Sequence, residues 1–125
     1  MKKLIFVITA AILIVSIYAS GCGISTEMVL APIEDVDIWA DNSSSKQYFA
    51  DVVSGEPDSC YEFDSYNVTR TGNTTRVEIF NLHSIGVACA EIYSYVEHTI
   101  PLGSDFVIGV NYTVEVNDVK KTFVA

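Results

Sequence analysis

The histidines His83 and His98 are the only imidazole side chains in the chain, and imidazole is the usual general base near neutral pH. A serine nucleophile would need such a base and a carboxylate, and it often lies at the centre of a Gly-x-Ser-x-Gly turn between a strand and a helix. The sequence has no such turn and no helical periodicity. We therefore expect no catalytic residues, no enzymatic activity and no cofactor. An enzyme stays open as a third alternative, and it would require His83 or His98 in a cleft beside a serine and an aspartate.

Two acidic stretches could place carboxylates near one another. Asp35 and Asp37 form the first stretch, and Asp58, Glu62 and Asp64 form the second. Calcium takes six or more oxygen ligands and usually a glycine-containing loop, and neither stretch has the spacing of an EF-hand. We expect no metal site. Structural calcium stays open as an alternative, and nothing in the pattern singles out a carboxylate pair for glycoside hydrolysis.

A signal peptide is predicted at the start of the chain. Lys2 and Lys3 precede a long apolar run, and small residues follow it, as in secretory signal peptides. The stretch Ala19-Ser20-Gly21-Cys22 resembles the lipobox of prokaryotic lipoproteins, in which the cysteine thiol receives a diacylglyceryl group. This resemblance implies cleavage before Cys22 and lipidation of its thiol.

The predicted domain organisation is a signal peptide over residues 1–21, a lipidated cysteine and tether over 22–27, and one domain over 28–125. The alternative is an uncleaved transmembrane anchor, because a spanning helix needs about 20 mostly apolar residues. Both alternatives attach the domain to the extracytoplasmic face of the cell membrane. The predicted location is therefore the membrane surface.

A disulfide between Cys60 and Cys89 is predicted, because these two cysteines remain once Cys22 carries lipid and exported thiols oxidise. The bond would close a loop of about 30 residues and stabilise the fold by about 3 to 4 kcal/mol. A zinc site or a catalytic thiol is the alternative. No Cys-x-x-Cys spacing supports it, and only His83 lies between the two cysteines.

The charge of the chain limits its partners. The formal net charge is −9, and removal of Lys2 and Lys3 with the signal peptide makes it −11. Such a surface repels nucleic acid and anionic lipid headgroups. We expect a membrane contact through the lipid anchor and a protein or glycan partner at the cell surface, and no nucleic acid.

Two sets of residues are candidate modification and binding sites. Asn42, Asn67, Asn73 and Asn111 each begin an Asn-x-Ser/Thr sequon, although threonine is also frequent in β proteins for its strand propensity.

By the period of two in a strand, Tyr93 and Tyr95 share one side with Glu91 and Glu97. Tyrosine is favoured at recognition surfaces, so this side is the predicted binding face. The alternative is an outer sheet face with ordinary cross-strand aromatic pairs.

The elements that must position these residues are strands. β-branched and aromatic runs separated by turn residues predict an all-β chain, and about seven strands in about 100 residues predict a single immunoglobulin-like β-sandwich. A change of phase near Ser65 predicts a bulge, and Tyr112 lies where a tyrosine corner would sit. Residues 82–87 are predicted as a loop. The predicted strands are residues 28–33, 36–40, 46–53, 60–70, 75–81, 88–102, 112–116 and 119–124.

The stretches "PDSCYEFDSY", "VACAEIYSYVEHTIPLGSDF" and "NYTVEVND", between Pro57 and Asp118, resemble small prokaryotic lipoproteins with a two-cysteine, immunoglobulin-like β domain. The resemblance implies a single exported domain with the cysteine pair as its framework. It carries over no catalytic residue. In immunoglobulin domains a tryptophan lies between the two cysteines, whereas Trp39 here precedes both.

The expected function is a membrane-tethered, non-enzymatic binding or structural domain at the cell surface. The alternative is an inhibitor of secreted hydrolases such as proteases or lysozyme, in which loops at residues 54–59 and 82–87 would enter an enzyme cleft.

Overall fold

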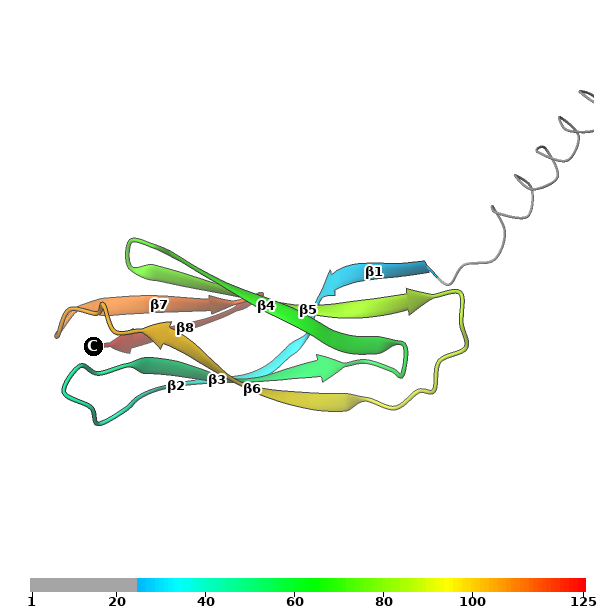
Figure 1. Ribbon diagram of the computed structural model, residues 1–125, viewed down its shortest axis with the longest axis horizontal. Helices are drawn as coiled ribbons and strands as arrows, with labels where there is room; N and C mark the ends of the chain where they lie inside the picture. The colour runs from blue at the N-terminus through cyan, green and yellow to red at the C-terminus, as the bar shows by residue number, and fades with distance from the viewer. Residues whose placement is uncertain (1–24) are drawn as a thin grey trace, which may run out of the picture.

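Eight strands make up most of residues 25–125, the part of the chain that this computed structural model describes. They form two facing sheets (Figure 1). No helix in this range is long and apolar enough to cross a membrane. The strands are β1 (Ser25–Leu30), β2 (Ile33–Ala40), β3 (Tyr48–Glu56), β4 (Tyr61–Thr71), β5 (Thr74–Ile85), β6 (Ser94–Gly103), β7 (Asn111–Val116) and β8 (Val119–Val124).

The large sheet is organised around β5, the longest strand. β4 pairs with one edge of β5 along most of its length. The other edge is shared, because β1 pairs antiparallel with residues 80–85 and β7 pairs parallel with residues 74–77. β8 continues this sheet beyond β7. The small sheet contains β2, β3 and β6, with β3 in the centre.

The sandwich has two distinct ends (Figure 1). We call the end where β1 begins the N-terminal end. It also carries the turn between β3 and β4 and the segment between β5 and β6. We call the opposite end, which carries the β4–β5 turn and the C-terminus, the far end.

The hydrophobic core lies between the sheets, because side chains alternate inward and outward along the central strands. In β3, Tyr48, Ala50 and Val52 are buried, whereas Asp51 between them is exposed. Across the gap, Ile79 of β5 is fully buried. Burial of this apolar surface is the main driving force for the fold.

Asn117 hydrogen-bonds the edge of β5 at the point between the residues that pair with β1 and those that pair with β7. It lies in the β7–β8 turn with a φ of 52°, a left-handed conformation in which asparagine is enriched. Its Oδ1 accepts a hydrogen bond from the Ile79 N–H at 2.9 Å, and its Nδ2 donates to the Ala31 carbonyl at 2.7 Å. Its own N–H donates to the Val77 carbonyl at 3.0 Å. Ile79 has no paired residue in β1 or β7, and the Asn117 side-chain amide therefore bonds its backbone as a neighbouring strand would.

Polar side chains connect the two sheets toward the N-terminal end. The buried Asn81 of β5 donates from Nδ2 to the Gly55 carbonyl of β3 at 2.9 Å. The bulge in β4 falls after Phe63, whose N–H donates to the Glu56 carboxylate at 2.9 Å. These contacts fix the spacing of the sheets where the apolar core ends.

Tyr112 holds the segment between β6 and β7. Its side chain is buried, and its hydroxyl accepts a hydrogen bond from the Val107 N–H at 2.8 Å. The Phe106 ring packs edge-on against it at 4.9 Å. This bond to the backbone a few residues upstream is the arrangement expected of a tyrosine corner.

The predicted β-sandwich is confirmed, and several local details are confirmed with it. The register shifts between Phe63 and Ser65, where a bulge is predicted. The β4–β5 turn contains Gly72 at a φ of 60°, and the last hairpin turns through Asn117 and Asp118.

Some predicted strand limits are wrong. Residues 82–85 belong to β5 and not to a loop, because β1 pairs with them. Residues 88–93 lie before β6, so the strand predicted over 88–102 begins only at Ser94. The predicted strand over 28–33 is divided at Ala31 and Pro32, where the chain passes from one sheet to the other. The structure has eight strands, one for each of the eight predicted ranges, where the expected sandwich count is about seven.

The start of the domain also differs from its predicted boundary. β1 begins at Ser25, so three residues of the tether predicted over 22–27 already pair with β5. The predicted signal peptide and the lipidation site Cys22 lie outside the described residues.

Replacement of Asn117 by glycine tests the role of its side chain. Glycine adopts a positive φ readily, so the turn is kept while the buried Ile79 N–H and Ala31 carbonyl lose their partner. We expect Asn117→Gly to lower the free energy of unfolding by about 2 to 4 kcal/mol, measured by urea denaturation. The matched control is Asn73→Gly in the exposed β4–β5 turn, with an expected change below about 0.5 kcal/mol. Equal effects of the two substitutions would contradict this role.

Candidate functional site

The outer face of the small sheet carries the most distinctive group of exposed side chains. Residues that point outward from three neighbouring strands form rows across this face, because paired residues share a side. No other strand covers it among residues 25–125 (Figure 1). We call it the acidic–aromatic face, and it consists of Glu34, Asp35, Asp37, Trp39, Phe49, Asp51, Val53, Tyr93, Tyr95, Glu97 and Thr99.

Carboxylates occupy the middle of the acidic–aromatic face. Asp37 of β2 lies directly opposite Asp51 of β3. Asp51 accepts a hydrogen bond from the Thr99 hydroxyl of β6 at 3.0 Å. In the next row, Asp35 and Glu97 lie on either side of Val53. Together these residues line a shallow hollow of about 300 Å³.

An aromatic pair borders the carboxylates toward the far end. The rings of Trp39 and Phe49 are stacked with centroids 4.5 Å apart and planes at 19°. They lie opposite each other on β2 and β3. Trp39 is 39% exposed, so part of this aromatic surface is open to solvent.

A second aromatic pair borders the carboxylates toward the N-terminal end. The ring centroids of Tyr93 and Tyr95 are 5.1 Å apart, and Tyr95 is 65% exposed. Tyr93 crosses over Gly55, where a side chain would collide with its ring. Its hydroxyl donates a hydrogen bond to Glu34, and this bond raises the pKa of Tyr93 to about 12. Glycine at position 55 therefore makes room for the ring.

The structure brings together Tyr93 and Tyr95 as expected, but Tyr93 reaches this side from the segment before β6 instead of from a continuous strand. The sequence pattern does not place Trp39, Phe49 and the carboxylates of β2 and β3 on this surface. Alternation along each strand predicts which side chains point outward. It does not predict which of them are neighbours across the sheet, because that depends on the pairing of β2, β3 and β6.

The carboxylates of this face have no cationic partner among residues 25–125. The ion pairs in this range join Glu115 to Arg76 and Lys120, and Glu27 to His83. Like charges directly opposite in a sheet repel each other. In the described part of the chain, no group of three metal-ligating side chains converges on the hollow. The charges are spread along the face and do not converge on one point.

His98 and Ser54 form a polar pair at the edge of the sandwich, where the half-buried His98 also lines the shallow hollow. The His98 Nε2 and the Ser54 Oγ share a hydrogen bond of 2.8 Å, and the ring packs 4.6 Å from Phe63 of the opposite sheet. Ser54 is fully buried, so its hydroxyl is not open to a substrate. No carboxylate of residues 25–125 hydrogen-bonds the ring. Burial lowers the pKa of His98 and favours the neutral ring.

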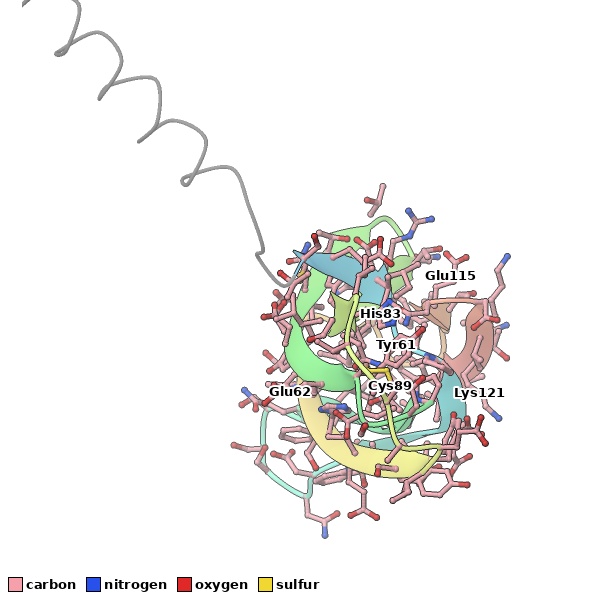
Figure 2. All side chains as sticks on the ribbon, turned by 90° about the vertical axis from the view of Figure 1, so that its right-hand side faces the viewer. Tyr61, Glu62, His83, Cys89, Glu115 and Lys121 are labelled. Atoms are coloured by element: carbon pink, nitrogen blue, oxygen red, sulfur yellow. A yellow bond between two sulfur atoms is a disulfide. The ribbon has the colours of Figure 1, made fainter. Side chains whose placement is uncertain are left out.

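His83 lies at the N-terminal end, which Figure 2 shows face-on. Its ring stacks on Tyr61 with centroids 4.1 Å apart and planes at 7°. Its Nδ1 lies 3.2 Å from the Glu27 carboxylate. These contacts join β1 and β4 across β5 and do not create a nucleophile.

The Cys60–Cys89 disulfide is present and joins the turn before β4 to the segment after β5. Asp58 is the third member of a close group with the two sulfurs, but both thiols are used by the disulfide. The Asp58 carboxylate accepts a hydrogen bond from the Cys60 N–H at 2.8 Å. Glu62 and Asp64 do not join it in a metal-ligating group within the described range.

All four predicted sequon asparagines are exposed. Asn42 lies between β2 and β3, Asn73 lies in the β4–β5 turn, and Asn111 begins β7, all toward the far end (Figure 1). Asn67 is an outward residue of β4. Their use as modification sites stays a prediction.

Comparison with known proteins identifies a family for this fold. Residues 52–125, which run from β3 to the C-terminus, match the family described as "ORF11 beta-sandwich domain". No curated protein and no solved structure matches the chain. The match covers both disulfide cysteines and agrees with the observed sandwich.

The half-buried His98 predicts a dependence of stability on pH. Because partial burial lowers its pKa below the ordinary value of 6.5, the unfolded chain binds a proton more readily than the folded chain. Stability is therefore lost as the pH falls from about 7 to below 6.5. We expect His98→Gln, which keeps a polar group beside Ser54, to show a smaller fall in Tm over this range than the wild type. Equal falls in the two proteins would show that His98 does not cause the dependence.

Proposed function

We propose that this chain, which belongs to the ORF11 beta-sandwich domain family, is a membrane-tethered, non-enzymatic binding domain that takes a cationic partner on its acidic–aromatic face. The observation that carries the proposal is a group of carboxylates that has no cationic partner among the described residues and lies between two aromatic pairs. The tether is the lipid anchor predicted at Cys22, and the location is the extracytoplasmic face of the cell membrane.

Charge complementarity supports a cationic partner. The domain without its signal peptide carries a net charge of −11, so its field attracts positive groups and raises their rate of encounter. On the face itself, the opposed Asp37 and Asp51 repel each other in the free protein. A bound cationic group would relieve this repulsion.

The spacing of the carboxylates suits an extended basic polypeptide segment. Asp35 and Asp37 are two residues apart on β2 and lie about 7 Å apart along the strand. Lysine or arginine residues at every second position of an extended segment have the same spacing. The partner we propose is therefore a protein segment with alternating basic residues.

The aromatic pairs would extend this recognition beyond charge. Tryptophan and tyrosine rings attract lysine and arginine side chains through cation–π interactions. The rows from Phe49 to Gly55 span about 20 Å, so basic side chains at both ends of a short segment could reach a ring. Tyr93 and Tyr95 thus keep their predicted place in the binding face.

The Ser54–His98 pair supports a non-enzymatic role. Among residues 25–125 it is the nearest approach to a nucleophile and base, and the serine is fully buried. As for a hydrolase inhibitor, residues 54–56 and 82–85, which would belong to the inserting loops, are strand residues of β3 and β5. Inhibition of a protease or lysozyme panel would still favour that function.

The test measures binding of a fluorescent extended peptide with alternating lysines to the purified full chain in detergent. We expect binding that weakens as salt is added, because exposed charges are screened. Asp37→Asn combined with Asp51→Asn is expected to weaken binding about tenfold, and Trp39→Ala about two- to fivefold.

The control variant removes the same amount of negative charge at positions away from the proposed binding face. Asp64→Asn combined with Asp118→Asn removes two exposed carboxylates that lie outside the acidic–aromatic face. We expect this variant to weaken binding less than about twofold. Equal losses in both double variants, or equal binding of a matched glutamate peptide by the wild type, would contradict the proposal.

A further inference from the structure

The chain from the last residue of β5 to near the start of β6 is mostly apolar and exposed. We call residues 85–92 the connecting segment, and every one of them is exposed. Glu91 is its only charged residue. Ile85 is 42% exposed, Val87 is 39% exposed and Ile92 is 63% exposed. A surface of this kind usually marks a contact with another apolar phase or molecule.

The connecting segment is fixed to the sandwich in this exposed position. The Cys60–Cys89 disulfide joins its middle to the turn before β4. Next to it, the Ser59 N–H donates to the Ala90 carbonyl at 3.0 Å, and the Ala90 N–H donates to the Ser59 hydroxyl at 2.7 Å. These bonds keep the apolar side chains outward before any partner arrives, so little conformational freedom is lost on contact.

The connecting segment lies at the N-terminal end of the sandwich. In Figure 1 it runs from one sheet to the other beside the start of β1, and Figure 2 shows Cys89 on the same end. β1 begins at Ser25, so only Gly23 and Ile24 would lie between a lipidated Cys22 and the sandwich. The three extended steps from Cys22 to Ser25 span roughly 10 Å. An anchor at Cys22 therefore holds this end close to the bilayer.

We propose that the connecting segment inserts its apolar side chains, with Ile92 foremost, into the lipid surface beneath the domain. This inference rests on the tether in the proposed function and adds a second membrane contact made by the folded domain itself. The acidic surface of the domain favours zwitterionic lipid over anionic lipid. Contact through this end would leave the acidic–aromatic face open at the side of the sandwich (Figure 1).

The experiment uses two variants of the full chain, each with a single tryptophan at one of the two ends of the sandwich. In a Trp39→Phe background, Ile92→Trp reports on the connecting segment, and Ile108→Trp is the matched control. Ile108 is 89% exposed and lies between β6 and β7, toward the far end. The lipidated proteins are reconstituted into phosphatidylcholine vesicles with and without brominated acyl chains, and flotation measures how much protein the vesicles hold.

We expect brominated lipid to quench the Ile92→Trp emission at least about twofold and ordinary lipid to shift it to shorter wavelength, because the ring lies among acyl chains. The Ile108→Trp emission should change by less than about a tenth, because that end lies the length of the sandwich away from the bilayer. Floating protein with an unquenched Ile92→Trp would overturn the insertion but leave the tether intact. Equal quenching at both positions would also overturn it, and protein that does not float would overturn both the tether and the insertion.

Discussion

The structure depends on the way in which one edge of β5 is completed by two different strands. β1 and β7 pair with separate halves of this edge, and a β-strand cannot leave buried N–H and carbonyl groups unpaired between them. Asn117 fills this position with a side-chain amide that bonds both Ile79 and Ala31. Because Ala31 marks the point where the chain leaves the large sheet, the same residue also fixes where β2 enters the small sheet.

The two candidate surfaces follow from this arrangement. β2 supplies Asp35, Asp37 and Trp39 to the acidic–aromatic face, so its entry into the small sheet sets the rows on that face. β1 pairs with the last residues of β5, and this pairing directs the connecting segment outward at the N-terminal end. The acidic–aromatic face then lies on the outer side of the small sheet, and the connecting segment lies at the N-terminal end of the sandwich. A tethered domain could therefore contact lipid and a partner at the same time.

Local signals predicted much of the fold, and long-range pairing accounts for what they missed. Alternation of apolar and polar residues predicted the sandwich, and a change of phase predicted the bulge near Ser65, because both depend on near neighbours. Pairing of β1 with residues 80–85 joins residues 50 or more positions apart in the sequence, and it makes residues 82–85 of a predicted loop part of a strand. For the site, Tyr93 and Tyr95 were predicted together, whereas the opposed Asp37 and Asp51 and the Trp39–Phe49 stack require the register of β2 and β3.

The most direct test of this account is hydrogen exchange at the Ile79 amide, which donates a hydrogen bond to the Asn117 side chain. If Asn117 completes the edge of β5, this amide exchanges only when the whole domain unfolds, with the same protection as the Val114 and Val116 amides in the neighbouring β7. Protection of Ile79 that falls to the level of the exposed β4–β5 turn, while β7 stays protected, would show that the two halves of the edge are independent and would contradict the account.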